Sequence, residues 1–222
     1  VGGESLTFTT SGSFDDKNAG AAKGATVTLT GFGGPDAGNY ALGSTLNVAT
    51  TAAITPATVD LVAASAASRV YNGTTAATVT GFTLAGTIAG DDVAAAGGGA
   101  FANRNAGTNK PVTVTLSGLT GTDAGNYQLG NTTATTLASI TPAPLNLVGA
   151  TVADKVYDGG TAASASGWTL AGVIGSDAVT GSGTASFASK TVGTAKPVAL
   201  TLTTLAGTDA GNYTLLQPAA LT

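Results

Sequence analysis

One five-residue string, Asp-Ala-Gly-Asn-Tyr, constrains the fold of this chain more than any other feature, because it occurs three times at an even spacing. The copies begin at Asp36, Asp123 and Asp209, which lie 87 and 86 residues apart. The same spacing separates three lysines: Lys23, Lys110 and Lys196. A period that barely changes over three copies indicates tandem folded repeats of about 86 residues, a normal size for a small domain.

Aligning the copies on this period predicts three repeats. Residues 1–57 form a partial repeat that lacks its N-terminal part, residues 58–143 a complete repeat, and residues 144–222 a repeat that lacks its last strand. The string Ile-Thr-Pro, at Ile54 and again at Ile140, marks the two junctions. Because the chain begins and ends within a repeat, we expect it to be a segment of a longer array.

Strand patterns dominate the sequence between these landmarks. In residues 112–117, Val and Leu alternate with Thr and Ser, and residues 25–29 and 198–202 follow the same pattern. Alternation with period two predicts half-buried strands, and the Asn-Gly and Asp-Gly pairs predict turns between them. Only the Ala-rich stretch Val62–Ser68 would be a helix on propensity alone, and its context favours a strand. We therefore predict an all-β fold, with a β-sandwich favoured over a β-solenoid because solenoid repeats are much shorter.

The repeated string also predicts a structural site. In immunoglobulin-like sandwiches a Tyr near the start of one strand hydrogen-bonds through its hydroxyl to upstream backbone, forming a tyrosine corner. Gly would supply an unusual backbone angle and Asp would supply turn hydrogen bonds. The predicted corner residues are Asp36, Gly38, Tyr40, Asp123, Gly125, Tyr127, Asp209, Gly211 and Tyr213. We expect the residue two positions after each Tyr to face the core: Leu42, Leu129 and Leu215.

These motifs resemble a known family. Lys155-Val156-Tyr157-Asp158-Gly159, the string Asp209–Tyr213 and the junction Ile140–Ala143 are similar to the YDG and MBG (mostly bacterial immunoglobulin-like) repeats of large, filamentous-haemagglutinin-like bacterial adhesins. The resemblance implies tandem immunoglobulin-like antiparallel β-sandwiches at the bacterial cell surface. The middle copy departs from the pattern, with Arg69 and Asn72 in place of the Lys and the Asp.

Composition excludes most catalytic chemistry. The 222-residue chain has no Cys and no His, which removes the usual nucleophile–base pairs and most zinc, haem and iron–sulfur sites. Charged residues are 9% of the chain and the net charge is −4, so no basic surface is available for nucleic acid. No apolar run approaches the roughly 20 residues of a membrane span. We predict no enzyme activity, no catalytic, cofactor-binding or metal-binding residues, no nucleic-acid partner and no membrane span in this segment.

Two other chemistries stay open beside this interpretation. Calcium is the one cofactor that the acidic loop residues permit, at Asp15-Asp16, Asp91-Asp92 and Asp177. A calcium site needs roughly 6–8 oxygen ligands, so solvated turn residues are the simpler interpretation. A Lys–Asn isopeptide bond would join Lys110 to Asn126, or Lys196 to Asn212 in the third copy, but it requires a buried neutral lysine.

The expected function is structural. The short Ile-Thr-Pro-Ala-Pro connection at Ile140–Pro144 limits bending, because proline fixes φ and favours an extended residue before it. We expect a stalk or extracellular filament body whose partners are other copies of the same repeat or chain in a fibre or rod. The alternative is an adhesin module that binds a cell-surface glycan or a host protein.

Overall fold

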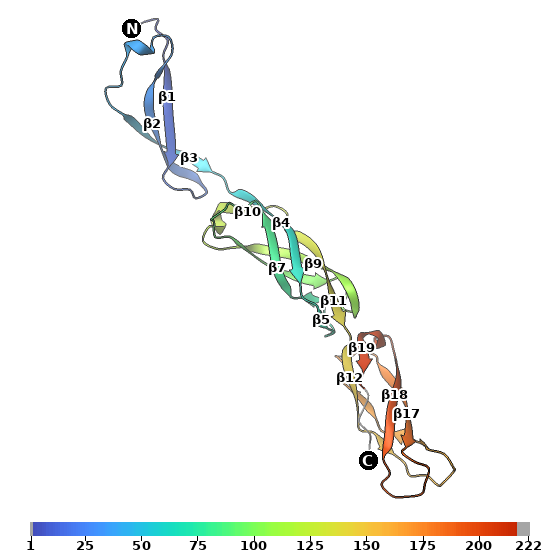
Figure 1. Cartoon of the computed structure of the whole chain (residues 1–222). Helices are drawn as coiled ribbons and strands as arrows, with labels where there is room; N and C mark the ends of the chain where they lie inside the picture. Colours follow the sequence, from blue (N-terminus) through green and yellow to red (C-terminus); the bar gives the residue numbers. More distant parts are fainter. Residues whose placement is uncertain (1, 217–222) are drawn as a thin grey trace. The chain divides into compact units, whose positions relative to one another are not determined.

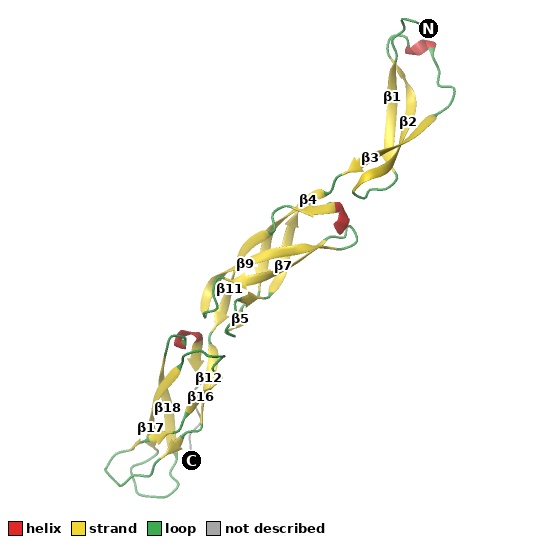
Figure 2. Ribbon diagram, turned by 180° about the vertical axis from the view of Figure 1, so that it is seen from behind, coloured by secondary structure: helices red, strands yellow, loops and turns green. Residues whose placement is uncertain are grey.

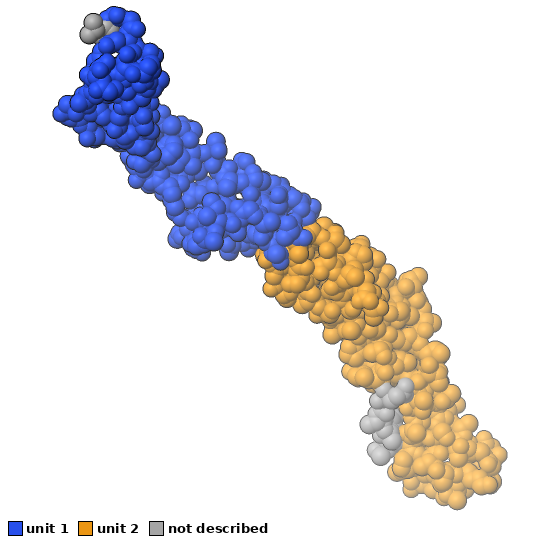
Figure 3. All heavy atoms as spheres, turned by 45° about the horizontal axis from the view of Figure 1, so that its top comes forward, with its two compact units in different colours: residues 1–62, 83–97, 116–133 blue, residues 63–82, 98–115, 134–222 orange. Residues whose placement is uncertain are grey.

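The computed structural model describes residues 2–216, and nearly all of their regular structure is β, in several small sheets (Figures 1 and 2). Val1 and residues 217–222, which the first and third predicted repeats include, lie outside the described residues. The chain divides into two compact units, residues 1–62, 83–97 and 116–133 in one and residues 63–82, 98–115 and 134–222 in the other (Figure 3). The division falls within the second repeat, so each compact unit contains one junction between consecutive repeats.

The first repeat is a single antiparallel sheet. Its strands β1 (Thr7–Phe14), β2 (Gly20–Gly33) and β3 (Leu46–Ile54) are ordered β1-β2-β3. The predicted strand at residues 25–29 lies within β2, but Val27 is exposed rather than buried. Alternation buries one face only when something packs on it, and among the described residues no second sheet of this repeat does so.

The second repeat has two sheets. The sheet β10-β4-β7 and the sheet β5-β11-β9-β8-β6 both contribute buried side chains. In β9 the burial alternates as predicted, with Val112, Val114 and Leu116 buried between exposed residues. Residues 62–66 of the Ala-rich stretch Val62–Ser68 belong to a strand, as expected, and residues 67 and 68 follow it without regular structure. The strands are β4 (Ala57–Ala66), β5 (Arg69–Val70), β6 (Ala76–Ala77), β7 (Val79–Ala85), β8 (Ala94–Phe101), β9 (Gly107–Thr120), β10 (Tyr127–Leu129) and β11 (Thr133–Thr141).

The third repeat follows a similar plan with shorter strands. Its sheets are β16-β12-β19, β13-β15 and β14-β17-β18. Leu145 on β12 is fully buried, and the predicted strand at residues 198–202 alternates as expected within β18. The strands are β12 (Ala143–Val148), β13 (Thr151–Val152), β14 (Ala162–Ala163), β15 (Ala165–Ser166), β16 (Thr169–Ala171), β17 (Thr180–Phe187), β18 (Val198–Ala206) and β19 (Tyr213–Leu215).

Three of the sheets contain a parallel pair, which corrects the expectation of wholly antiparallel sheets. The first strand of the second repeat pairs in parallel with the strand that begins at Tyr127 (Tyr127 opposite Ala57), and β12 pairs in the same way with Tyr213 (Ala143 opposite Tyr213). A third parallel pair joins β11 to β5. Parallel neighbours need a long crossover connection, and the strands between the first strand and the repeated Tyr supply it.

The connections between repeats are very short. Only Thr55 and Pro56 separate β3 from β4, and only Pro142 separates β11 from β12. Since proline fixes φ and the flanking residues are already extended, few backbone angles are free at either connection.

The alternation of burial yields a direct test of the core. Leu61 is 1% exposed on β4, whereas Leu137 on β11 of the same repeat is 59% exposed. We expect Leu61→Ala to lower the free energy of unfolding by about 2–5 kcal/mol, because the lost burial leaves a cavity. Leu137→Ala is the matched control and should cost far less. Urea denaturation of the two variants measures the difference, and equal losses would contradict the assignment of the core.

Candidate functional site

The repeated string forms the same local structure in all three copies. Its Ala-Gly-Asn residues make the 3-10 turns η1 (Ala37–Asn39), η2 (Ala124–Asn126) and η3 (Ala210–Asn212), and the Tyr that follows each turn is extended. The Asp before each turn accepts a hydrogen bond from the backbone of an upstream loop. The donor N–H groups and the distances to the Asp Oδ2 are Ser5 to Asp36 at 2.8 Å, Asp92 to Asp123 at 3.0 Å and Ala178 to Asp209 at 3.0 Å.

The glycines that the bend requires are not those of the repeated string. Gly38, Gly125 and Gly211 lie inside the turns without a positive φ, and a Cβ there would meet nothing within 4 Å, so the expected unusual backbone angle is wrong. The glycine two residues before each Asp has the positive φ instead. At Gly121, for example, φ is 110° and a Cβ would stand 2.2 Å from the carbonyl oxygen of Asp92. Only glycine fits such an angle and such a close approach.

In the second and third repeats the hydroxyl of the repeated Tyr joins a backbone amide to a carboxylate. Tyr127 accepts a hydrogen bond from the N–H of Ile88 at 3.0 Å and donates to Asp91 Oδ2 at 2.7 Å. Tyr213 does the same with Ile174 at 2.9 Å and Asp177 at 2.6 Å. The amide lies 39 residues upstream, much farther than in an immunoglobulin tyrosine corner. The importance of the contact for stability stays a prediction.

In this way each repeat presents a pair of carboxylates at one end. Asp91 and Asp123 form the pair of the second repeat, and Asp177 and Asp209 form the pair of the third. The equivalent positions of the first repeat are Glu4, which accepts a hydrogen bond from Tyr40, and Asp36. Glu4, Asp91 and Asp177 follow the repeat period, since they lie 87 and 86 residues apart. The sequence did not connect them directly, because the first of the three is Glu rather than Asp.

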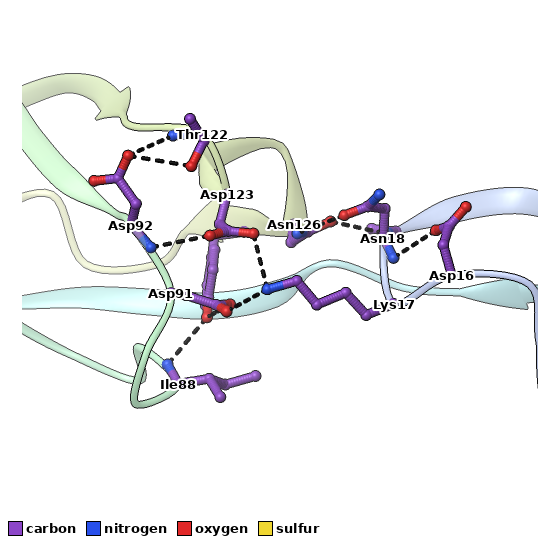
Figure 4. A network of polar contacts seen from close by, with 11 residues as sticks. Asp16, Lys17, Asn18, Ile88, Asp91, Asp92, Thr122, Asp123 and Asn126 are labelled. Atoms are coloured by element: carbon purple, nitrogen blue, oxygen red, sulfur yellow. Dashed lines mark hydrogen bonds and ion pairs between the residues drawn. The ribbon is translucent and has the colours of Figure 1, made fainter.

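At the first junction a lysine from the first repeat sits between the two carboxylates of the second repeat (Figure 4). Lys17 lies in the loop between β1 and β2, and its Nζ is 2.6 Å from Asp91 Oδ1 and 2.9 Å from Asp123 Oδ1. Asn126, from the turn before the Tyr, accepts a hydrogen bond from the N–H of Ala19 at 2.8 Å and donates to Asn18. Sequence reasoning did not single out Lys17.

The second junction repeats this contact with an arginine. Arg104, in the loop between β8 and β9, places Nη1 3.0 Å from Asp177 Oδ1 and Nη2 2.8 Å from Asp209 Oδ1. The N–H of Ala106 donates to Asn212 Oδ1 at 2.8 Å, which is the counterpart of the bond between Ala19 and Asn126. The period would have found this cation too, since Lys17 and Arg104 are 87 residues apart.

Tyr71 strengthens the second junction. Its hydroxyl donates to Asp177 Oδ2 at 2.7 Å, and its ring packs edge-on against Tyr213 with the centroids 5.4 Å apart. Only 2% of Tyr71 is exposed. Burial and the hydrogen bond to Asp177 raise the pKa of Tyr71 to about 12, so it stays a neutral donor near neutral pH.

The charged groups of the junctions hold one another in their ionised forms. The hydrogen bond to Asp91, with a second to Asp123, raises the pKa of Lys17, and Lys17 in turn lowers the pKa of Asp91. At the second junction the hydrogen bond from Tyr213 lowers the pKa of Asp177, aided by Tyr71 and Arg104 and opposed by burial. Arg104 and its two carboxylates thus form a network rather than an isolated surface pair.

Within the described residues, neither a calcium site nor the Lys110–Asn126 isopeptide pair is brought together. Among residues 2–216 no group of three or more acidic side chains could hold a metal ion. Asp16 pairs with Lys23, and Lys110 donates to Asn103 Oδ1 at 2.6 Å while Asn126 contacts the first repeat, so the structure does not bring Lys110 and Asn126 together. Within the described part of the chain, no helix has the length and apolar character needed to cross a membrane.

These observations define a tandem β-repeat protein in which consecutive repeats meet through a recurring contact between one cation and two carboxylates. The chain belongs to the YDG domain family, which matches residues 1–52, 55–136 and 141–221. No significant match was found among curated proteins or among solved structures.

Removal of one tyrosine hydroxyl tests the contact that holds the carboxylate pair. We expect Tyr213→Phe to lower the free energy of unfolding by about 1–3 kcal/mol, because the N–H of Ile174 and the carboxylate of Asp177 both lose a buried partner. Tyr157→Phe, at a Tyr that is 59% exposed, should leave stability unchanged. Urea denaturation checks both, and a Tyr213→Phe variant as stable as the parent would refute the role of the hydroxyl.

The lowered pKa of Asp177 predicts an acid-sensitive junction. Its folded pKa lies below its ordinary value because Tyr213, Tyr71 and Arg104 favour the carboxylate. The unfolded chain therefore binds the proton more readily, and stability falls as the pH drops from about 5 through the folded pKa. We expect Asp177→Asn to be less stable than the parent at pH 7 and to lose less stability between pH 7 and pH 3. Urea denaturation of the variant and of the parent at pH 7 and at pH 3 measures both differences.

Proposed function

We propose that the chain is a structural segment, the stalk or filament body, of a secreted bacterial surface protein that serves adhesion or cell-surface assembly. Its immunoglobulin-like β-sandwich repeats would act as spacers in a fixed order. The observation that carries this proposal is the recurrence of one junction, since Lys17 and Arg104 make the same contact with consecutive carboxylate pairs.

The connections support spacing rather than free tethering. A flexible tether uses a Gly- and Ser-rich linker that samples many conformations. Here β11 passes into β12 through Pro142 alone, and the side chains beside the connection are tied across the junction. Ordering such a junction costs little conformational entropy, because few residues remain to be ordered.

The extracellular location rests on the family resemblance and on composition. The YDG match covers all three repeats, and the Thr-rich, weakly charged strands suit an exposed sheet surface. Copies of the same repeat are therefore the first partners that we expect, before any glycan or host protein.

A double variant tests whether the junctions hold neighbouring repeats together. Lys17→Ala combined with Arg104→Ala removes both bridging cations, and we expect the repeats to tumble more independently, because the carboxylate pairs then repel without a counter-charge. Measurement of ¹⁵N relaxation in each repeat should show shorter local correlation times than in the parent.

Lys23→Ala is the matched control, since Lys23 pairs with Asp16 inside its own repeat. A parent whose repeats already tumble independently would contradict the structural role. Saturable binding of the same chain on a glycan array, together with independent tumbling, would favour the adhesin-module alternative.

A further inference from the structure

We propose that the end of the third repeat that carries Tyr157 and Lys190 is a docking surface for another YDG repeat, which binds it through its Tyr and its two carboxylates. The inference rests on the proposed function and names the partner that this surface fits.

The surface is the counterpart of one that is already occupied in the second repeat. Tyr157 lies 86 residues after Tyr71, and Lys190 lies 86 residues after Arg104. In the second repeat both of those side chains contact Asp177 of the repeat that follows. The third repeat therefore carries a Tyr and a cation at the equivalent positions, with a lysine in place of the arginine, as Lys17 is at the first junction.

Within residues 2–216 these groups are largely exposed in the third repeat. Tyr157 is 59% exposed, against 2% for Tyr71, and Val156 and Val192 beside it are 90% and 87% exposed. Within residues 2–216, Lys190 makes no ion pair. A cluster of exposed apolar side chains next to a cation is typical of an interaction site, and the carboxylate pair of another repeat supplies the opposite charge.

The backbone of the same loop differs between occupied and unoccupied ends. In the first two repeats the strand after the cation begins at Gly20 and at Gly107. The equivalent Gly193 lies in a loop, and β18 begins only at Val198. In the first repeat this part of β2 pairs with the last strand of its own repeat, Gly20 opposite Ile54, so the loop is strand-like where that strand lies beside it.

A cavity of about 650 Å³ beside Tyr157 shows what else the surface requires. Asp154 and Ala195 line it, and they are equivalent to Ser68 and Asn109 of the second repeat. There, Ser68 and Asn109 hydrogen-bond to Ser139 on β11. A strand equivalent to β11 therefore completes the surface, and a test of docking must supply it.

An extended chain provides both the strand equivalent to β11 and a repeat that follows it. Residues 1–222 are followed directly by a second copy of residues 137–222, which continues the period because Thr222 is equivalent to Thr136. In the added copy Tyr157→Phe and Lys190→Ala remove the duplicate groups. A carbodiimide then joins only those lysines and carboxylates that are in contact, and mass spectrometry identifies the linked peptides.

We expect a link from Lys190 to Asp177 or Asp209 of the added copy, beside the link from Lys17 to Asp91 or Asp123 that serves as internal standard. Lys190→Ala should abolish the Lys190 link and spare the Lys17 link. The combination of Asp177→Asn and Asp209→Asn in the added copy should have the same effect. Lys155→Ala is the control, because Lys155 pairs locally with Asp158. Nitration of Tyr157 by tetranitromethane should slow in the extended chain relative to the parent.

The outcomes separate this inference from the proposed function. A Lys17 link without a Lys190 link, and with nitration of Tyr157 unchanged, overturns the docking surface and leaves the junctions of the parent intact. Loss of both links overturns the proposed function as well. If the extended chain fails to fold, chains of residues 1–222 followed only by residues 137–142 supply the missing strand, and they are mixed at high concentration with ¹⁴N and ¹⁵N labels. There a Lys190–Asp36 link between differently labelled chains supports docking, and its absence refutes it.

Discussion

The structure depends on one electrostatic arrangement, in which two carboxylates of one repeat share a single cation from the repeat before it. Two carboxylates brought together without a counter-charge would raise each other's pKa and destabilise the fold. Lys17 and Arg104 remove that cost at the two junctions. In the second and third repeats the cation of the preceding repeat supplies this counter-charge, so we expect the folding of these repeats to be coupled to that neighbour.

The tyrosine of the repeated string prepares this arrangement within each repeat. Its hydroxyl fixes one carboxylate, and a loop amide fixes the other, as with Asp177 and Asp209. The carboxylates are thus oriented before the cation arrives, so little side-chain entropy remains to be lost on docking. The same string supplies the Asn that binds the backbone beside the cation, as Asn212 binds the N–H of Ala106. A short motif therefore serves the bend inside a repeat and the contact outside it.

Sequence alone predicted the parts of this fold that depend on local pattern. The alternation at residues 112–116 and 198–202 reports which side chains face a core, and both segments are strands with that burial. The exposure of Val27 and the parallel pairing of Tyr127 with Ala57 could not be predicted in this way, because they depend on which sheets lie nearby. The junction residues could be found from the period but not from the repeated motifs. Lys17 and Arg104 lie 87 residues apart, as do Glu4 and Asp91, but the residue type changes in both pairs.

The two junctions differ in ways that set their relative strength. Lys17 is a point charge whose side chain is 63% exposed, so solvent and salt screen its attraction to Asp91 and Asp123. Arg104 instead directs two nitrogens of its planar fork at two carboxylates, one of which, Asp177, is 3% exposed. Tyr71 adds a hydrogen bond and a buried ring at the second junction. Added salt should therefore loosen the first junction before the second, because the more exposed Lys17 is screened more strongly than Arg104.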